Sequence, residues 1–198
     1  MKQYIKMLLF VIILGGVTSG LLVGMDMLTK DRIALNKQAQ VKSAILDAYN
    51  IKYNLNTVHD IFEDEVTVIQ YEGEDAFYID NNTGQISFIF SGGGVWGPIR
   101  GVITFESDFR TVVNLGILEQ VETPGLGGVV AEKWYLEKYK GVVFATESPY
   151  ILVRHGSSEN LPNEVDAITG GTRTSEKFEE ILNTAYAEFK AKWAIVGV

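Results

Sequence analysis

The sequence predicts an α+β protein: a single N-terminal transmembrane helix, followed by one domain of antiparallel strands that ends in a helix. Three observations support this prediction. Residues 7–25 carry no charge, residues 66–120 contain short runs of β-branched and aromatic residues, and apolar residues recur at helical spacing over residues 175–193. We therefore divide the chain into a transmembrane anchor, residues 1–30, and one domain, residues 31–198.

The anchor is the uncharged segment from Met7 to Met25, which reads "MLLFVIILGGVTSGLLVGM". As a helix it is roughly 28 Å long, close to the thickness of the bilayer hydrocarbon. The charges on either side favour neither orientation. Gly16, Gly20 and Gly24 share one face, which favours close packing against another membrane helix. The alternative is a cleaved signal peptide, but the length of the segment and the lack of an A-x-A site favour a retained anchor.

The domain is expected to begin with a helix that continues from the anchor, over residues 31–49, because apolar residues repeat there at helical spacing. Strands are then predicted from β-branched and aromatic runs, with Asn81-Asn82-Thr83-Gly84 as a turn. The expected strands are residues 66–71, 76–80, 85–90, 101–106, 111–120, 141–146 and 150–155. An amphipathic helix is predicted over residues 129–139, and the last helix, over residues 175–193, places one apolar face in the core.

Composition excludes several classes of function. The net charge is −8, and residues 31–198 hold 14 positive and 24 negative side chains, or −10, without a cluster of Lys and Arg. Binding to a nucleic acid is therefore not expected. The absence of cysteine excludes disulfides, Cys-ligated zinc, iron–sulfur clusters and attached c-type haem. The two histidines, His59 and His155, stand in unrelated contexts, and His155 is expected at the surface or a strand end. No metal site is predicted, so electron transfer requires an organic cofactor.

One stretch near the C-terminus, "VDAITGGTRTSEKFEEIL", combines glycines and hydroxyl residues in front of the last helix. Gly170 and Gly171 permit close approach of another group, and Thr174 or Ser175 can cap the helix. A helix N-terminus attracts a phosphate, with Arg173 as a charge partner. The residues alone leave two interpretations open, a phosphate-binding loop and an ordinary loop with a cap. The stretch is neither a Walker loop nor a dinucleotide fingerprint.

Two motifs carry a resemblance to a known family. "DAITGGT", from Asp166 to Thr172, resembles the flavinylation motif of the FMN-binding subunits of the Rnf and Nqr complexes, the RnfG/NqrC family. "ETPGLGG", from Glu122 to Gly128, resembles the second hallmark of the same proteins. The single N-terminal helix, the glycine-rich "GGGVWGPI" and the order of these features also match, so the resemblance covers nearly the whole chain.

The resemblance implies that FMN is joined through its phosphate to Thr172, by a flavin transferase that uses FAD and a divalent metal. Asp166, Thr169 and Gly170 match the other fixed positions of the motif. Gly171 departs from the family, which usually has alanine there. Glycine leaves room for the transferase but loosens the loop.

The second motif is expected, by resemblance, to form the pocket beside the flavin ring. Thr123 can hydrogen-bond a flavin edge, Leu126 can cover the ring face, and the alternative is a plain surface turn. Trp96 either shields the flavin or packs in the core or in its loop, and Glu122 is either a solvated charge or a pocket acceptor. The predicted cofactor-binding residues here are Glu122, Thr123, Pro124, Gly125, Leu126, Gly127 and Trp96.

The function implied is that of a covalent-FMN electron-transfer subunit, non-catalytic alone, in an ion-pumping Rnf ferredoxin:NAD⁺ oxidoreductase. The short chain favours this G-type subunit over the NqrC-type subunit of the Na⁺-translocating NADH:quinone reductase. Expected partners are the other membrane and peripheral subunits and the flavin transferase. The family also implies a single-pass protein of the cell membrane with its domain on the extracytoplasmic side. Two alternatives remain, a membrane-anchored module for a non-covalent ligand or partner and a stand-alone extracytoplasmic flavin reductase.

Overall fold

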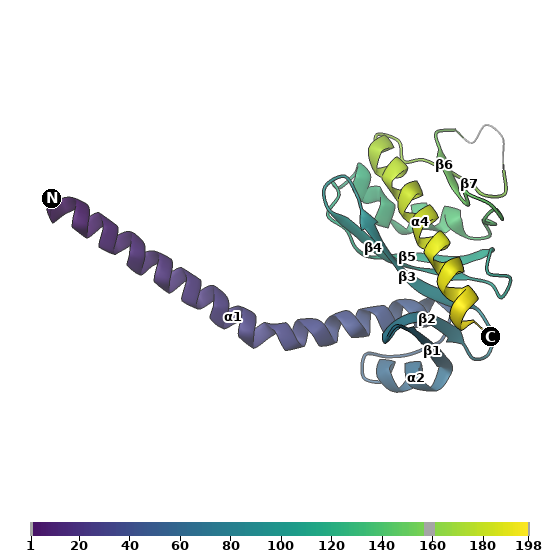
Figure 1. Ribbon diagram of the computed structural model, residues 1–198, viewed down its shortest axis with the longest axis horizontal. Coiled ribbons are helices and arrows are strands. Elements are labelled where there is room, and N and C mark those ends of the chain that lie inside the picture. The colour runs from purple at the N-terminus through teal and green to yellow at the C-terminus, as the bar shows by residue number, and fades with distance from the viewer. Residues whose placement is uncertain (1, 157–160, 198) are drawn as a thin grey trace. The chain divides into compact units, whose positions relative to one another are not determined.

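The computed structural model describes residues 2–156 and 161–197 of the chain. These residues form two compact units, residues 1–40 and residues 41–198. The first unit is entirely helical. The second contains the sheet, the remaining helices and the C-terminal segment of the first helix (Figure 1).

The first helix, α1 (Lys2–Ala48), is continuous from the apolar segment onward, as predicted. By length and composition it is able to cross a membrane. On this helix the hydroxyls of Thr18 and Thr29 donate to the carbonyls of Leu14 and Met25 at 2.9 and 2.8 Å. In a membrane, a bond of this kind would satisfy a hydroxyl that lipid leaves without a partner.

The second unit is built on a five-stranded antiparallel sheet whose strands follow one another in chain order. The strands are β1 (Val66–Tyr71), β2 (Glu74–Asp80), β3 (Ile86–Gly93), β4 (Pro98–Phe105) and β5 (Val112–Glu119). The first hairpin closes on Glu72 and Gly73, both with positive φ, as a two-residue turn requires. The five strands expected between residues 66 and 120 are therefore present.

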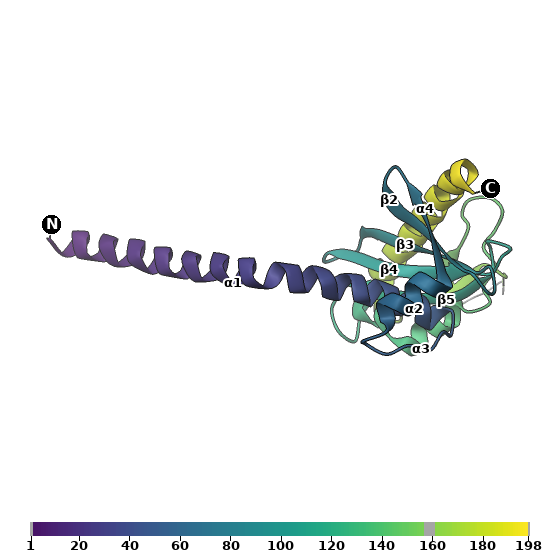
Figure 2. The ribbon, with the colours of Figure 1, turned by 90° about the horizontal axis from the view of Figure 1, so that it is seen from below.

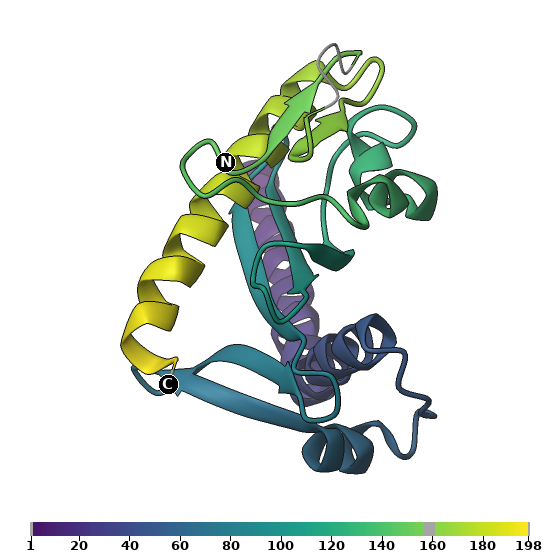
Figure 3. The ribbon, with the colours of Figure 1, turned by 90° about the vertical axis from the view of Figure 1, so that its right-hand side faces the viewer.

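Alternation along the strands gives the sheet two buried faces. On one face Phe77 packs edge-on against Phe189 of α4 (Thr172–Val196), and Phe88 stacks on the same ring at 4.8 Å between centroids. Figure 3 shows α4 running along this side of the sheet. On the other face Tyr78 accepts a hydrogen bond from Tyr49 through its carbonyl and packs against Phe62.

Phe62 belongs to a short helix that the sequence pattern did not predict, α2 (Val58–Glu65). Lys42, near the end of α1, forms an ion pair with Glu63 at 3.3 Å and lies over the ring of Phe62. Figure 2 shows α2 beside this end of α1. The end of α1 and α2 thus cover the sheet face opposite α4.

The region after the sheet differs most from prediction. Instead of one amphipathic helix over residues 129–139, there are three short pieces: η1 (Gly127–Ala131), α3 (Lys133–Leu136) and η2 (Glu137–Tyr139). Glu132 breaks the helix because its backbone is extended, with φ −79° and ψ 134°. Of the predicted amphipathic pattern, the pair Tyr135 and Tyr139, four residues apart, is buried as expected.

The strand expected over residues 141–146 does not form, and the described residues there make only an isolated bridge between Val143 and Thr111. Their backbone N–H groups are spread over different partners, with Val143 donating to Pro162 and Phe144 to Arg110. The strand expected over residues 150–155 shortens to β6 (Leu152–Arg154). It pairs in parallel with β7 (Glu164–Asp166), which was not predicted.

Candidate functional site

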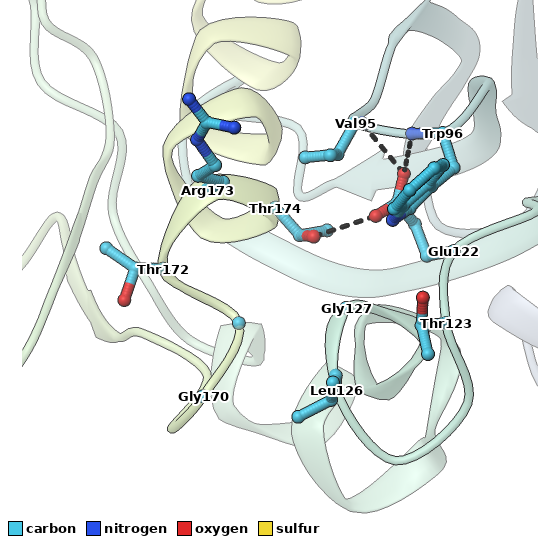
Figure 4. Close-up of a pocket in the computed structure, with 11 residues that line it drawn as sticks. Val95, Trp96, Glu122, Thr123, Leu126, Gly127, Gly170, Thr172, Arg173 and Thr174 are labelled. Carbon is cyan, nitrogen blue, oxygen red and sulfur yellow. Dashed lines mark hydrogen bonds between the residues drawn. The ribbon is translucent and has the colours of Figure 1, made fainter.

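A cleft opens between the loop after β3, the loop after β5 and the start of α4 (Figure 4). Its volume is about 370 Å³, within the range of pockets that hold small ligands and cofactors. Its walls come from three segments that are far apart in the chain. They are Val95, Trp96, Glu122, Thr123, Leu126, Gly127, Gly170, Gly171, Thr172, Arg173 and Thr174.

Glu122 connects these three segments. Its side chain is buried, with 4% of the residue exposed. Oε1 accepts hydrogen bonds from the backbone N–H groups of Val95 and Trp96 at 2.8 and 3.0 Å, and Oε2 accepts one from the hydroxyl of Thr174 at 2.8 Å. Glu122 is therefore not a solvated charge, and both of its carboxylate oxygens accept hydrogen bonds from within the chain. It holds the glycine loop and α4 together.

Two glycines make room for this carboxylate. A Cβ on Gly94 would lie 2.6 Å from Oε1 of Glu122, and a Cβ on Gly127 would lie 2.7 Å from Oε2 and collide with Thr174. Neither approach is possible for a residue with a side chain unless the carboxylate moves. Gly94 of the glycine-rich segment and Gly127 of the second motif thus have a packing role at this site.

The last helix begins at Thr172, with Gly171 as its N-cap, and no side chain caps it. The cap expected from Thr174 or Ser175 is wrong, because both hydroxyls have other partners. Thr174 donates to Glu122, while Oγ of Ser175 accepts the backbone N–H of Ile168 at 2.9 Å. The backbone N–H groups of the first turn remain without an intrahelical partner and give the end of α4 a positive potential.

Burial sorts the hydroxyl residues of the glycine-containing stretch into two pairs. Thr174 and Ser175 are 4% and 1% exposed, so an external enzyme has no access to them. Thr169 and Thr172 are exposed, and of these two only Thr172 lines the cleft. Its Oγ1 lies 3.0 Å from Nε2 of His155, the residue that follows β6. Sequence reasoning missed this contact, because an isolated histidine 17 residues away gives no signal.

The rim of the cleft is apolar. Trp96 is 72% exposed, Leu126 48% and Val95 37%, although each is a large apolar side chain. Trp96 therefore does not pack in the core, and the three side chains offer a surface suited to a flat aromatic ligand. Val95 was not anticipated, although it stands beside Trp96 in the glycine-rich loop.

Of the remaining predicted residues, Thr123 lines the cleft, whereas Pro124, Gly125 and Asp166 do not. The carbonyl of Thr123 accepts the N–H groups of Leu126 and Gly128, and Gly125 has the positive φ, 73°, that this turn needs. Pro124 and Gly125 form the turn without lining the cavity. Asp166 lies on β7 and forms an ion pair with Lys138 at 3.4 Å, so the structure does not bring it to the cleft.

Arg173 is exposed on the first turn of α4 and lines the cleft. Its guanidinium adds a positive charge to that of the helix N-terminus, so an anionic group beside Thr172 meets two favourable charges. Over residues 2–156 and 161–197, no group of three or more His, Cys, Asp or Glu side chains is arranged to hold a metal ion. The cleft suits a ligand with a flat ring and an anionic end.

The match to a family of known proteins agrees with this geometry. A family model described as the FMN-binding domain matches residues 94–187, which include both motifs. The NqrC-type subunit of the Na⁺-translocating NADH-quinone reductase of Pasteurella multocida is 30% identical over 120 residues, which are 57% of this chain and 46% of that protein. The corresponding protein of Neisseria meningitidis serogroup A is 31% identical over 99 residues, 49% of this chain and 38% of that protein. The chain thus spans less than half the length of these relatives.

Solved structures share the fold. Shewanella oneidensis NqrC superposes with a TM-score of 0.63 at 21% identity, over 79% of this chain and 99% of that one. The NqrC-type subunit of the Na⁺-translocating NADH-quinone reductase of Parabacteroides distasonis gives 0.62 at 24% identity, over 79% and 94%. The solved structures confirm the predicted fold. The family model and the aligned relatives agree with the predicted resemblance to the RnfG/NqrC family, and residues 94–187 are the part of the chain that matches the FMN-binding domain.

Proposed function

We propose that this chain carries FMN in the cleft, joined through its phosphate to Oγ1 of Thr172, and passes electrons as a subunit of an ion-pumping membrane complex. The observation that carries the proposal is the position of Thr172. It is the one exposed hydroxyl among the residues described as lining the cleft that also stands at the start of a helix. A phosphodiester formed there meets the positive end of α4 and Arg173.

The ring of the flavin is proposed to lie on the apolar rim of Trp96, Leu126 and Val95, with Thr123 beside its polar edge. Glu122, Gly127, Gly170 and Gly171 shape this pocket, while Thr169, Pro124, Gly125 and Asp166 support its loops. Because the rim side chains are exposed, the ring edge remains accessible to another protein. Such access favours an electron carrier over an enzyme that encloses its own substrate. When bound, FMN supplies the redox chemistry.

The remaining assignments follow from the relatives. Both aligned relatives are named as subunits of a Na⁺-translocating NADH-quinone reductase, which favours an NqrC-type subunit. The order of motifs fits a G-type subunit of an Rnf ferredoxin:NAD⁺ oxidoreductase equally well. Affinity purification of the tagged chain from its own membranes separates the two, because the co-purifying subunits identify the complex.

We also propose that residues 1–30 anchor the chain by a single pass in the cell membrane and that residues 31–198 form the domain on the extracytoplasmic side. The apolar first part of α1 supports the anchor. A cysteine placed at an exposed position such as Glu147 tests the orientation. We expect a membrane-impermeant thiol reagent to label it in intact cells, and labelling only after lysis contradicts the proposal.

The covalent link is tested by expressing the full chain with an FAD-dependent flavin transferase in the same compartment. We expect flavin fluorescence that survives denaturation and a mass increase of FMN less one water. Thr172→Ala is expected to abolish both, whereas Thr169→Ala and Thr174→Ala retain them. An unmodified wild-type chain, beside a transferase that is active on another target, contradicts the proposal. If the chain carries FMN that is lost on denaturation, the result supports the alternative function, a module that binds its ligand non-covalently.

A further inference from the structure

His155 lies within hydrogen-bond distance of the hydroxyl that we propose as the flavin acceptor. Its Nε2 is 3.0 Å from Oγ1 of Thr172, and both residues are exposed. Figure 4 shows that the Thr172 side chain leaves α4 on the side opposite Thr174, away from Glu122 and Trp96. The acceptor oxygen is therefore paired with the histidine rather than with the hydrogen bonds that brace the cleft.

The strand that ends just before His155 is held from two directions. The parallel pairing of β6 with β7 continues one step further, since the N–H of Ala167 donates to the carbonyl of Arg154 at 2.8 Å. Arg154 also forms an ion pair with Glu179 of α4 at 2.6 Å, and the same carboxylate accepts the N–H of Val153. Because Thr172 and Glu179 belong to one helix, the strand that leads to His155 is held against the same helix that carries the partner hydroxyl.

A threonine hydroxyl is a weak nucleophile that needs a base when it attacks phosphorus. Imidazole is the side chain that most often fills this role, and a base must lie about 2.6–3.2 Å from the proton's heavy atom. His155 meets this requirement in the free chain. The carboxylate of Glu122 does not make such a contact with Thr172. Its two oxygens accept hydrogen bonds from Val95 and from Thr174.

We propose that His155 is the proton acceptor for flavin transfer to Thr172, so that the chain contributes a catalytic residue to its own modification. This inference rests on the proposed covalent attachment of FMN. Oγ1 of Thr172 forms a bond to the FMN phosphorus of FAD, the pyrophosphate P–O bond breaks, and AMP leaves. The hydroxyl proton passes to Nε2 and from there to AMP or solvent. The imidazolium formed in this step faces the new phosphodiester and stabilises its charge.

The test compares rates of modification of the full chain in detergent by purified flavin transferase with FAD and its divalent metal. Intact mass and in-gel flavin fluorescence report the product. His155→Ala is expected to slow the reaction about 10²-fold, the usual contribution of a general base. His155→Gln, which still reaches the hydroxyl but takes up no proton, is expected to be similarly slow. His59→Ala, at the only other histidine, is the matched control and keeps the wild-type rate.

Added imidazole distinguishes chemistry from structure. We expect it to raise the rate of His155→Ala at least tenfold and to leave the wild-type and His59→Ala rates unchanged. A wild-type rate in His155→Ala overturns the inference while the covalent attachment stands. Full activity in His155→Gln, or no response to imidazole, also overturns it, since His155 then only orients the side chain. If the wild-type chain is not modified at all, this inference and the proposed attachment fail together.

Discussion

Removing the carboxylate of Glu122 tests whether one buried side chain holds the cleft together. Glu122→Ala leaves the N–H groups of Val95 and Trp96 and the hydroxyl of Thr174 without their acceptor. A hydrogen bond to a charged group contributes about 1.5–3 kcal/mol when it is buried. Because Val95 and Trp96 are exposed, water replaces part of two of these bonds, and we expect a total loss of about 3 kcal/mol.

Glu122→Gln is the matched substitution, because its amide oxygen still accepts both N–H groups. The hydroxyl of Thr174 can rotate and accept from the new NH₂ group, so only the charge is lost, at about 1 kcal/mol. For a domain of this size about 1 kcal/mol lowers Tm by about 2–4 °C. The expected decreases in Tm are therefore about 6–12 °C for the alanine variant and about 2–4 °C for the glutamine variant.

The assay is thermal unfolding of the full chain in detergent, followed by near-ultraviolet circular dichroism. Glu147→Ala, at an exposed carboxylate, serves as the surface control and is expected to change Tm by less than about 2 °C. If Glu122→Ala unfolds within the range of this control, the carboxylate does not brace the cleft. Equal losses for alanine and glutamine contradict the hydrogen-bond explanation, because the two variants then share only the loss of charge.

Three further predictions concern packing and ionisation. Gly127→Ala places a methyl group against the braced carboxylate and is expected to cost about 2 kcal/mol, whereas Gly93→Ala, with nothing within 4 Å, stays within about 0.5 kcal/mol in the same thermal assay. In Gly171→Ala the new Cβ lies 2.8 Å from Cγ2 of Ile168, and we expect the free energy of unfolding to fall by about 1–3 kcal/mol. The second substitution Ile168→Leu removes this Cγ2 branch and is expected to recover part of the loss. If the double variant recovers nothing, the clash with Ile168 is not the cause. Burial raises the pKa of Tyr186 from 10.0 to about 12, so its neutral form stabilises the fold fully below pH 10 and this contribution is lost as pH rises toward 12. Melts at pH 8 and 11 are expected to show a smaller alkaline loss in Tyr186→Phe than in wild type, by about 1.4 kcal/mol per pH unit above 10.

The sheet could be predicted from the sequence because its signals are local. Alternation such as Ile86, Phe88 and Phe90 on one side of β3 indicates a buried face directly, and Asn81-Asn82-Thr83-Gly84 indicates the turn before this strand. The region after β5 could not be predicted in this way. Tyr135 and Tyr139 stand at helical spacing, yet Glu132, an exposed residue before them, has an extended backbone that the spacing of apolar residues does not signal.

The loops that line the site could be predicted from the sequence, but the hydrogen bonds between these loops and other segments could not. The two motifs indicate where the cleft lies, because their residues are consecutive in the chain. The bond between Glu122 and Thr174 joins residues 52 positions apart, and the contact between His155 and Thr172 depends on two three-residue strands that carry almost no pattern. Such pairings arise from tertiary packing and leave no trace in a local sequence window.

The hydrogen bonds of Glu122 also bear on the order of synthesis and folding. The cleft draws its walls from residues 95–96, 122–127 and 170–174, and synthesis proceeds from the first of these segments to the last. Until α4 has emerged from the ribosome and docked on the sheet, Thr174 does not reach the carboxylate and Thr172 does not stand at the start of a helix. Under the proposed attachment, a transferase that recognises the assembled cleft acts only on a chain that has already folded.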